Sequence, residues 1–80
     1  MTRTLDQLPV GQSACVIGLD LTGAQRRRML DLGFTAGAWV TALQRSPFGD
    51  PTAYGVLDAV IALRGSDARM IHIAAPSAIR

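Results

Sequence analysis

The sequence predicts a mainly β protein: a small, strongly bent antiparallel barrel of about five short strands with one α-helix inserted after the first strand. Short apolar runs rich in Val, Ile and Ala alternate with Gly, Pro and Asp, as strands alternate with turns. Most runs follow one another too closely for the crossovers that parallel neighbours need. At 80 residues the chain has room for one domain, expected over residues 1–75, with residues 76–80 as a flexible tail.

The first elements are a short helical turn and a strand. Thr4 and Gln7 have the spacing of a capping box, which predicts a helical turn whose leucines point inward. Residues 12–19 follow as a strand bounded by glycine and aspartate. Alternation places Ala14 and Val16 on one face of that strand.

The one substantial helix is expected over about Gly23–Leu32. Thr22, with a glutamine three residues later, repeats the capping-box spacing at its start. Gly33 supplies the left-handed residue that ends the helix, so that Phe34 can contact Met29 in a Schellman-type end.

Four further strands and a second helical turn complete the pattern. The strands are expected over residues 38–45, 52–57, 60–64 and 71–75. The second and third of these are joined at Asp58 and Ala59 in a hairpin. Residues 65–70 allow one helical turn before the last strand.

The composition fits a compact domain in a reducing compartment. Hydrophobic residues make up 49% and charged residues 18%, which is too apolar for a disordered segment. No apolar run approaches the roughly 20 residues that span a bilayer, and the start lacks a basic-then-apolar leader, so we expect a cytoplasmic protein. All eight basic residues are Arg and all six acidic residues are Asp; the net charge of +2 is too weak to predict a nucleic-acid partner.

Residues that could support a reaction are few. The single cysteine, Cys15, excludes an internal disulfide and is expected to pack as a small hydrophobe. His72 is the only histidine, and alternation in its strand turns it away from the core. Neither a catalytic set nor a metal-ligand cluster results, and any metal on His72 would be adventitious or shared between chains. We therefore expect no enzymatic activity and no cofactor.

A run of three arginines, Arg26, Arg27 and Arg28, lies on the expected helix. Such a run could bind phosphate, but the chain has few aromatic residues to interleave with it. A solvated helix face is therefore favoured, with Arg27 paired to Asp31 four residues later. Contact of Arg27 and Arg28 with an acidic partner surface is the alternative.

A rigid loop is expected around Phe48, which lies between Pro47 and Pro51. A phosphate-binding loop at Gly49 is not expected, because such a loop needs consecutive backbone N–H donors and the two prolines have none. Phe48 either plugs the barrel or anchors a partner, and burial statistics favour the plug.

Three segments together resemble the FeoA family, small proteins that accompany the ferrous-iron transporter FeoB in bacteria. Arg28–Phe34 with Gly37 is similar to the family's RLLELGL-x-x-G, Pro47–Pro51 to its P-L-G-D-P, and Leu63–Ile73 to its L-R-x-x-E-A-x-x-I-x-V. The resemblance covers about Leu5 to Ile73.

The chain departs from the family pattern at four positions, and these departures are conservative for packing. They are Ala36 for Pro, Phe48 for Leu, Asp67 for Glu, and Asp58 near a customary Gly.

The resemblance implies an SH3-like β-barrel with an inserted helix, located in the cytosol and without enzymatic activity. It also implies action by contact with the cytoplasmic, nucleotide-binding portion of FeoB, with an effect on GTP hydrolysis or transport, and a link to the membrane only through that transporter. The open alternative is an SH3-like regulatory or nucleic-acid-associated module, since similar barrels form the C-terminal domain of metal-dependent repressors. The sequence contains no DNA-binding helix pair, which speaks against it.

Trp39 is the most informative departure from the family pattern, because the family usually has a polar residue there. It lies on the strand face opposite Val40, and Leu57 and Val60 likewise lie opposite the inward residues of their strands. So apolar an outer face predicts an interface, in which Trp39 with Leu57 or Val60 contributes to a homodimer or to FeoB contact. The alternative is that the N-terminal helical turn covers them.

Overall fold

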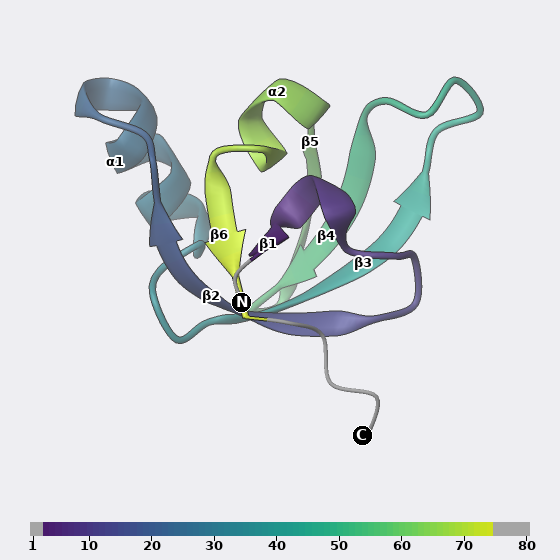
Figure 1. The fold of residues 1–80 in the computed structure, drawn as a ribbon, viewed down its shortest axis with the longest axis horizontal. Coiled ribbons are helices and arrows are strands. Elements are labelled where there is room, and N and C mark those ends of the chain that lie inside the picture. Colours follow the sequence, from purple (N-terminus) through teal and green to yellow (C-terminus); the bar gives the residue numbers. More distant parts are fainter. Residues whose placement is uncertain (1–2, 75–80) are drawn as a thin grey trace.

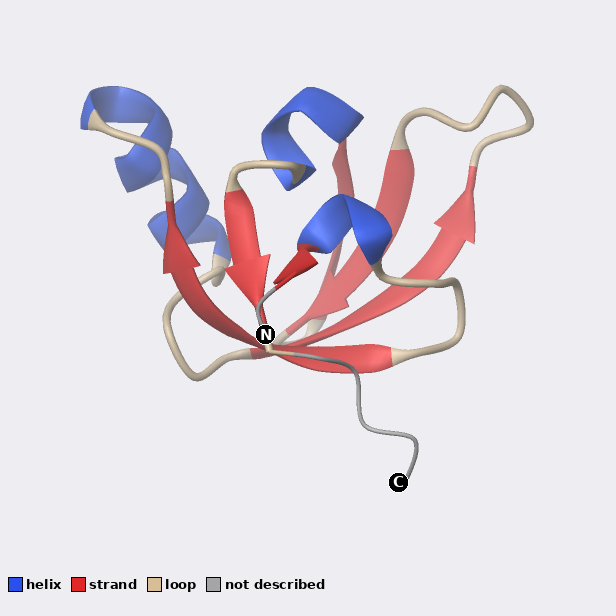
Figure 2. Cartoon of the chain, in the orientation of Figure 1, coloured by secondary structure: helices blue, strands red, loops and turns tan. Residues whose placement is uncertain are grey.

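The computed structural model describes residues 3–74 and contains a six-stranded antiparallel sheet with one helix projecting at its side (Figures 1 and 2). The strands are β1 (Arg3–Thr4), β2 (Ser13–Leu19), β3 (Trp39–Arg45), β4 (Thr52–Val56), β5 (Ala59–Leu63) and β6 (Ile71–Ile73). The helices are the 3-10 turn η1 (Leu5–Gln7), α1 (Gly23–Leu32) and α2 (Gly65–Ala68). The mainly β, antiparallel prediction is confirmed, whereas the expected tail, residues 76–80, lies outside the described residues.

Strand β2 bends the sheet, because its two halves pair with different strands. Its first half pairs with β3, where Cys15 lies opposite Trp39, and its second half pairs with β6, where Leu19 lies opposite Ile71. A register shift between Val16 and Gly18 accommodates the bend. The strand order is β1-β6-β2-β3-β4-β5, so the sheet wraps around the core (Figure 1).

The strand count and the closure of the barrel differ from the prediction. Arg3–Thr4 is an additional strand paired with β6, and two residues are too short to give a periodic signal in sequence. In hydrogen-bonding terms the sheet is not closed, since β1 and β5 are its two edges.

The core forms from the inward faces of β2 to β6, whose side chains alternate between buried and more exposed. Leu5 and Leu8 from the N-terminal segment are fully buried against it, and the hydroxyl of Tyr54 donates a hydrogen bond to the Leu5 carbonyl oxygen at 3.4 Å. Gln7 Oε1 accepts the expected capping-box hydrogen bond from the Thr4 N–H at 3.2 Å. The largest fully buried side chains are Tyr54, Phe34, Leu5, Leu8, Ile71, Ile73, Val16, Val40 and Val56.

Helix α1 has the predicted bounds and the predicted end. Gly33 has φ 112°, its N–H bonds to the Leu30 carbonyl, and the Phe34 N–H bonds to the Met29 carbonyl at 3.0 Å, the pairing of a Schellman motif. At the other end, Thr22 occupies the N-cap position but makes no side-chain capping hydrogen bond, so that half of the prediction is wrong.

The β4–β5 hairpin turns one residue earlier than predicted. Val56 pairs with Ala59, so Leu57 and Asp58 form the turn and Leu57 is not a strand residue. Four strand ends also move inward: β2 begins at Ser13, β3 begins at Trp39, β5 ends at Leu63 and β6 ends at Ile73.

Candidate interaction surface

The outer face of the sheet is apolar over three strands. In this face Thr41, Gly55 and Val60 lie side by side across β3, β4 and β5. Trp39 projects from the same side of β3, opposite the buried Val40, and is 60% exposed; Val60 is 67% exposed. The N-terminal turn therefore does not cover these side chains, and that alternative is wrong.

Gly55 shapes this face by having no side chain. A Cβ added there would lie 3.3 Å from Leu43 Cδ1, so the Leu43 side chain covers the Gly55 backbone. We use the term outer apolar face for the surface formed by Trp39, Leu43, Val60 and Ala62, all of which are exposed. Alternation predicts Leu43 on the side of Trp39 and Ala62 on the side of Val60, although neither is among the predicted contact residues.

A shallow depression of about 270 Å³ continues the outer apolar face toward the β3–β4 loop. Pro47 and Pro51 line it together with Ala53 and Ala62. The face therefore extends from Trp39 to the base of the loop that holds Phe48.

Phe48 projects into solvent with 95% of its surface exposed, so the predicted plug is wrong. The loop is closed by its own hydrogen bonds: Ser46 Oγ donates to the Asp50 carbonyl at 2.8 Å, and the Gly49 N–H to the Ser46 carbonyl at 2.8 Å. Because these bonds fix a tight turn at the end of two strands, the side chain at its tip cannot reach the core.

The same loop is tied to the helical turn α2. Asp50 Oδ1 accepts a hydrogen bond from the Gly65 N–H at 2.7 Å. Asp50 and Gly65 are far apart in sequence, and no local pattern signals such a contact.

Leu57 lies at the hairpin tip and borders the end of α1. It is 79% exposed, and a Cβ added to Gly33 would lie 2.9 Å from Leu57 Cδ1. The structure thus places Trp39 and Val60 on the outer apolar face and Leu57 in the turn at its border.

The arginines of α1 are solvated. Arg26, Arg27 and Arg28 are exposed, and in this helix only Met29 is buried. The predicted pair between Arg27 and Asp31 does not form: among residues 3–74 the ion pair present is that of His72 and Asp20.

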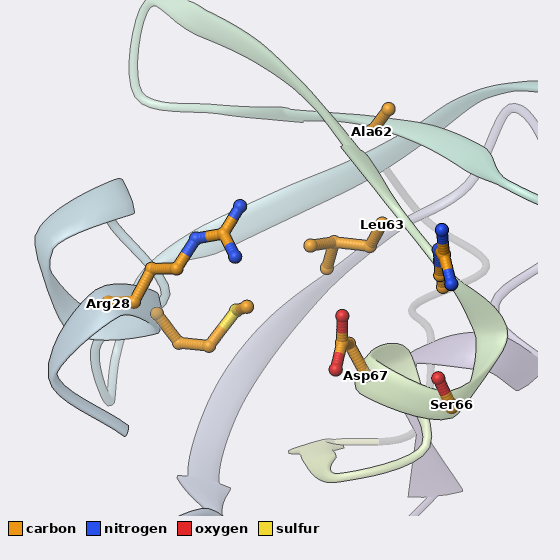
Figure 3. Close-up of a pocket in the computed structure, with 7 residues that line it drawn as sticks. Arg28, Ala62, Leu63, Ser66 and Asp67 are labelled. Carbon is orange, nitrogen blue, oxygen red and sulfur yellow. The ribbon is translucent and has the colours of Figure 1, made fainter. Parts of the chain in front are cut away.

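Arg28 lines a polar cleft of about 460 Å³ between α1, β5 and α2 (Figure 3). Arg64 at the end of β5 and Ser66 and Asp67 on α2 also line it, while Met29 and Leu63 form its apolar part. Figure 3 shows the Arg28 side chain extending from α1 toward Leu63.

The residues considered for metal binding are dispersed. His72 Nε2 lies 2.6 Å from Asp20 Oδ2, and Cys15 is half-buried beside Trp39 with its thiol directed to the Val16 carbonyl at 3.6 Å. Within the described part of the chain, no three His, Cys, Asp or Glu side chains gather in a metal-binding arrangement. None of the helices described is long and apolar enough to cross a membrane.

Comparison with known proteins shows to which family the chain is similar. The family model described as the FeoA domain matches residues 3–75. A fusion protein of Fe(2+) transport protein A and the Fe(2+) transporter FeoB from Porphyromonas gingivalis is 33% identical over 69 residues, which are 86% of this chain and 8% of that protein.

Solved structures agree with the family match. The crystal structure of Stenotrophomonas maltophilia FeoA with zinc, described as a prokaryotic SH3 domain protein, is 36% identical over 90% of this chain and 89% of that one, with a TM-score of 0.80. Iron(II) transport protein A from Clostridium thermocellum is 27% identical, with a TM-score of 0.84 over 88% of this chain and 43% of that one. A manganese-dependent transcriptional repressor, at 19% identity and a TM-score of 0.75, shares the fold alone. The SH3-like fold expected from the sequence is confirmed.

Proposed function

Because the chain belongs to the FeoA family, we propose that it is a non-enzymatic accessory protein of ferrous-iron uptake that acts by protein–protein contact with a FeoB-type transporter. The observation that supports this most directly is the Porphyromonas gingivalis relative, which joins the two proteins in one polypeptide. Covalent linkage raises the effective concentration of one module at the other, which is useful when the two modules bind each other.

The proposed contact is on the cytoplasmic side of the membrane, where the nucleotide-binding portion of the transporter lies. Binding there would change GTP hydrolysis or transport, and the chain would reach the membrane only through its partner. Ferrous iron is then the cargo of the transporter, and no residue of this chain needs to hold it.

The outer apolar face is the surface we assign to this contact. Trp39 is large and exposed, and it shares its face of the sheet with smaller apolar side chains, as energetically dominant interface residues often do. Phe48 and Leu57 border the same side of the molecule as further apolar candidates, and Arg27 and Arg28 are candidates for acidic groups of the partner. Burying these apolar groups supplies the favourable free energy of association.

Replacement of Trp39 by Arg tests this assignment. We expect Trp39→Arg to weaken binding to the cytoplasmic portion of FeoB by at least about tenfold, because a buried aromatic anchor is lost and a charge is placed in an apolar contact. Binding is measured by isothermal titration calorimetry, with circular dichroism to show that the variant is folded. Gln12→Arg, which adds the same residue at an exposed polar position, is the matched control and should bind like the wild type.

Each other outcome has a defined meaning. Unchanged FeoB binding by Trp39→Arg would remove this residue from the contact. If, in the absence of FeoB, the variant had a different oligomeric mass from the wild type, the face would be assigned to self-association. Failure of the wild-type chain to bind FeoB would contradict the proposed function. A salt-dependent shift of DNA or RNA by the wild-type chain would support the regulatory alternative instead.

A further inference from the structure

Strand β5 is an edge of the sheet that lacks several of the devices that usually protect an edge, although α1 and α2 flank the cleft at its C-terminal end. The opposite edge, β1, is only two residues long, whereas β5 has five residues in regular register with β4. Its sequence, Ala59–Leu63, contains no charge and no proline, and its pairing has no bulge. Natural proteins commonly use such devices to prevent pairing with another strand, so their absence points to an edge that does pair.

The main-chain groups available at this edge follow from the hairpin. Val56 and Ala59 flank a two-residue turn and form a hydrogen-bonded pair, and such pairs alternate along an antiparallel ladder. Ile61 therefore bonds to β4, whereas Val60 and Ala62 direct their N–H and C=O groups away from β4. In the described residues no backbone hydrogen bond joins Val60 or Ala62 to another segment.

The charges that flank this edge match a second copy of the same strand. Asp58, in the turn, precedes it and Arg64 follows it; both are exposed, and they lie two residues before Val60 and two residues after Ala62. When two β5 strands pair antiparallel about Ile61, Val60 of one copy lies opposite Ala62 of the other, and Asp58 lies opposite Arg64. If the register is shifted by two residues, Asp58 and Arg64 each lie opposite an uncharged residue. The charge pattern therefore favours the register centred on Ile61.

The polar cleft supplies the place where the partner's carboxylate would go. Arg28 and Arg64 line it at the C-terminal end of the β5 edge, and among residues 3–74 neither forms an ion pair (Figure 3). The one carboxylate lining the cleft is Asp67, which leaves an excess of positive charge. A carboxylate entering from a second copy is therefore favoured.

We propose that β5 pairs with β5 of a second copy across a two-fold axis, with Asp58 of each copy entering the cleft of the other. Such an interface is self-complementary, as two-fold symmetry requires. The pairing uses the edge of the sheet and leaves the outer apolar face open, so the faces of the two copies join into one larger surface.

Charge reversal in the chain alone tests the pairing, independently of any transporter. Sedimentation velocity over a range of concentrations gives the dimer dissociation constant at low salt. We expect Asp58→Arg and Arg64→Asp each to weaken the dimer by about tenfold or more, because two attractive contacts become repulsive in the symmetric pair. The double variant Asp58→Arg with Arg64→Asp should restore the constant to within about threefold of the wild type, since the swapped charges oppose each other again.

A matched control and a main-chain probe complete the test. Arg45→Asp makes the same charge change at the end of β3, two strands from the edge, and should dimerise like the wild type. The amides of Val60 and Ala62 should become protected from hydrogen exchange as concentration rises.

Several results would overturn the proposal. A monomer at all concentrations up to about 1 mM would do so, as would a dimer that the single reversals leave intact or that the double variant does not rescue. Protection of the Val60 and Ala62 amides only after addition of a FeoB fragment would assign the edge to the transporter instead.

Discussion

Leu57 occupies a backbone conformation that favours glycine. Its φ is 55°, and among residues 3–74 it is the one non-glycine residue with a positive φ. Its side chain is largely exposed. An L-residue in this region costs about 1–2 kcal/mol, and a side chain this exposed offsets little of that cost. The strain is therefore retained at a position where the apolar side chain borders the outer apolar face.

Replacement of Leu57 by Gly should stabilise the protein. We expect the free energy of unfolding to rise by about 0.5–1 kcal/mol, because relief of strain exceeds the entropy that glycine adds to the unfolded chain. The measurement is urea unfolding followed by circular dichroism. Val60→Gly is the control, since Val60 is similarly exposed but has ordinary strand geometry, and it should lose about 0.5–1 kcal/mol. A loss of stability in Leu57→Gly would show that Leu57 is not strained.

Phe48 and Trp39 show how far single residues can be predicted. Trp39 was placed correctly on the outer side, because a strand period of two fixes its direction relative to Val40. For Phe48 the residue type alone predicts burial, as it does for most phenylalanines. Its exposure follows from the hydrogen bonds of its loop, which residue type does not report.

Helix α1 shows the same contrast at the level of elements. Its bounds were predicted without error because Gly33 provides a local stop that needs no partner from elsewhere in the chain. The turn of the β4–β5 hairpin was misplaced by one residue, because pairing of Val56 with Ala59 decides it and Leu57 is not a typical turn residue.

Replacement of Gly33 by Ala should destabilise the end of this helix. Its φ of 112° lies outside the region that alanine tolerates, and the new Cβ would approach Leu57 Cδ1 to 2.9 Å. We expect a loss of about 1–2 kcal/mol in thermal or urea unfolding. Gly18→Ala is the matched control, because an added Cβ there meets nothing within 4 Å. Equal stability of the two variants would contradict this account of the helix end.

Tyr54 connects parts of the whole molecule that are distant in sequence. Its buried hydroxyl on β4 bonds to the Leu5 carbonyl of η1, and desolvation by burial raises the pKa of its phenol above the ordinary value of 10.0. Below pH 10 both the folded and the unfolded chain keep the proton, so the full stability is present. As the pH rises above that value, the unfolded chain ionises first and folding loses stability until the folded phenol also ionises.

The variant Tyr54→Phe separates these contributions. At pH 7 we expect a loss of about 0.5–1 kcal/mol, at the low end for a hydrogen bond, because the Leu5 carbonyl still accepts the Leu8 N–H. Between about pH 9.5 and 11 its stability should fall less steeply than that of the wild type. No lysine and no second tyrosine obscures the comparison, which is made by urea unfolding at each pH. If the free energy of unfolding changed with pH in the same way for both proteins, ionisation of Tyr54 would not contribute to the loss of stability at high pH.

The sequence by itself determined the class of fold, the family, the helix α1 and the inward faces of β3 to β6. These depend on period, turn chemistry and motif spacing, which are local properties of the chain. The tertiary structure alone decided the exposure of Phe48, the turn at Leu57, the bond from Asp50 to Gly65, and the position of β5 at an open edge with Arg28 and Arg64 beside it. Each of these depends on segments distant in sequence coming together, and the free energy of such contacts is not encoded in any short stretch of residues.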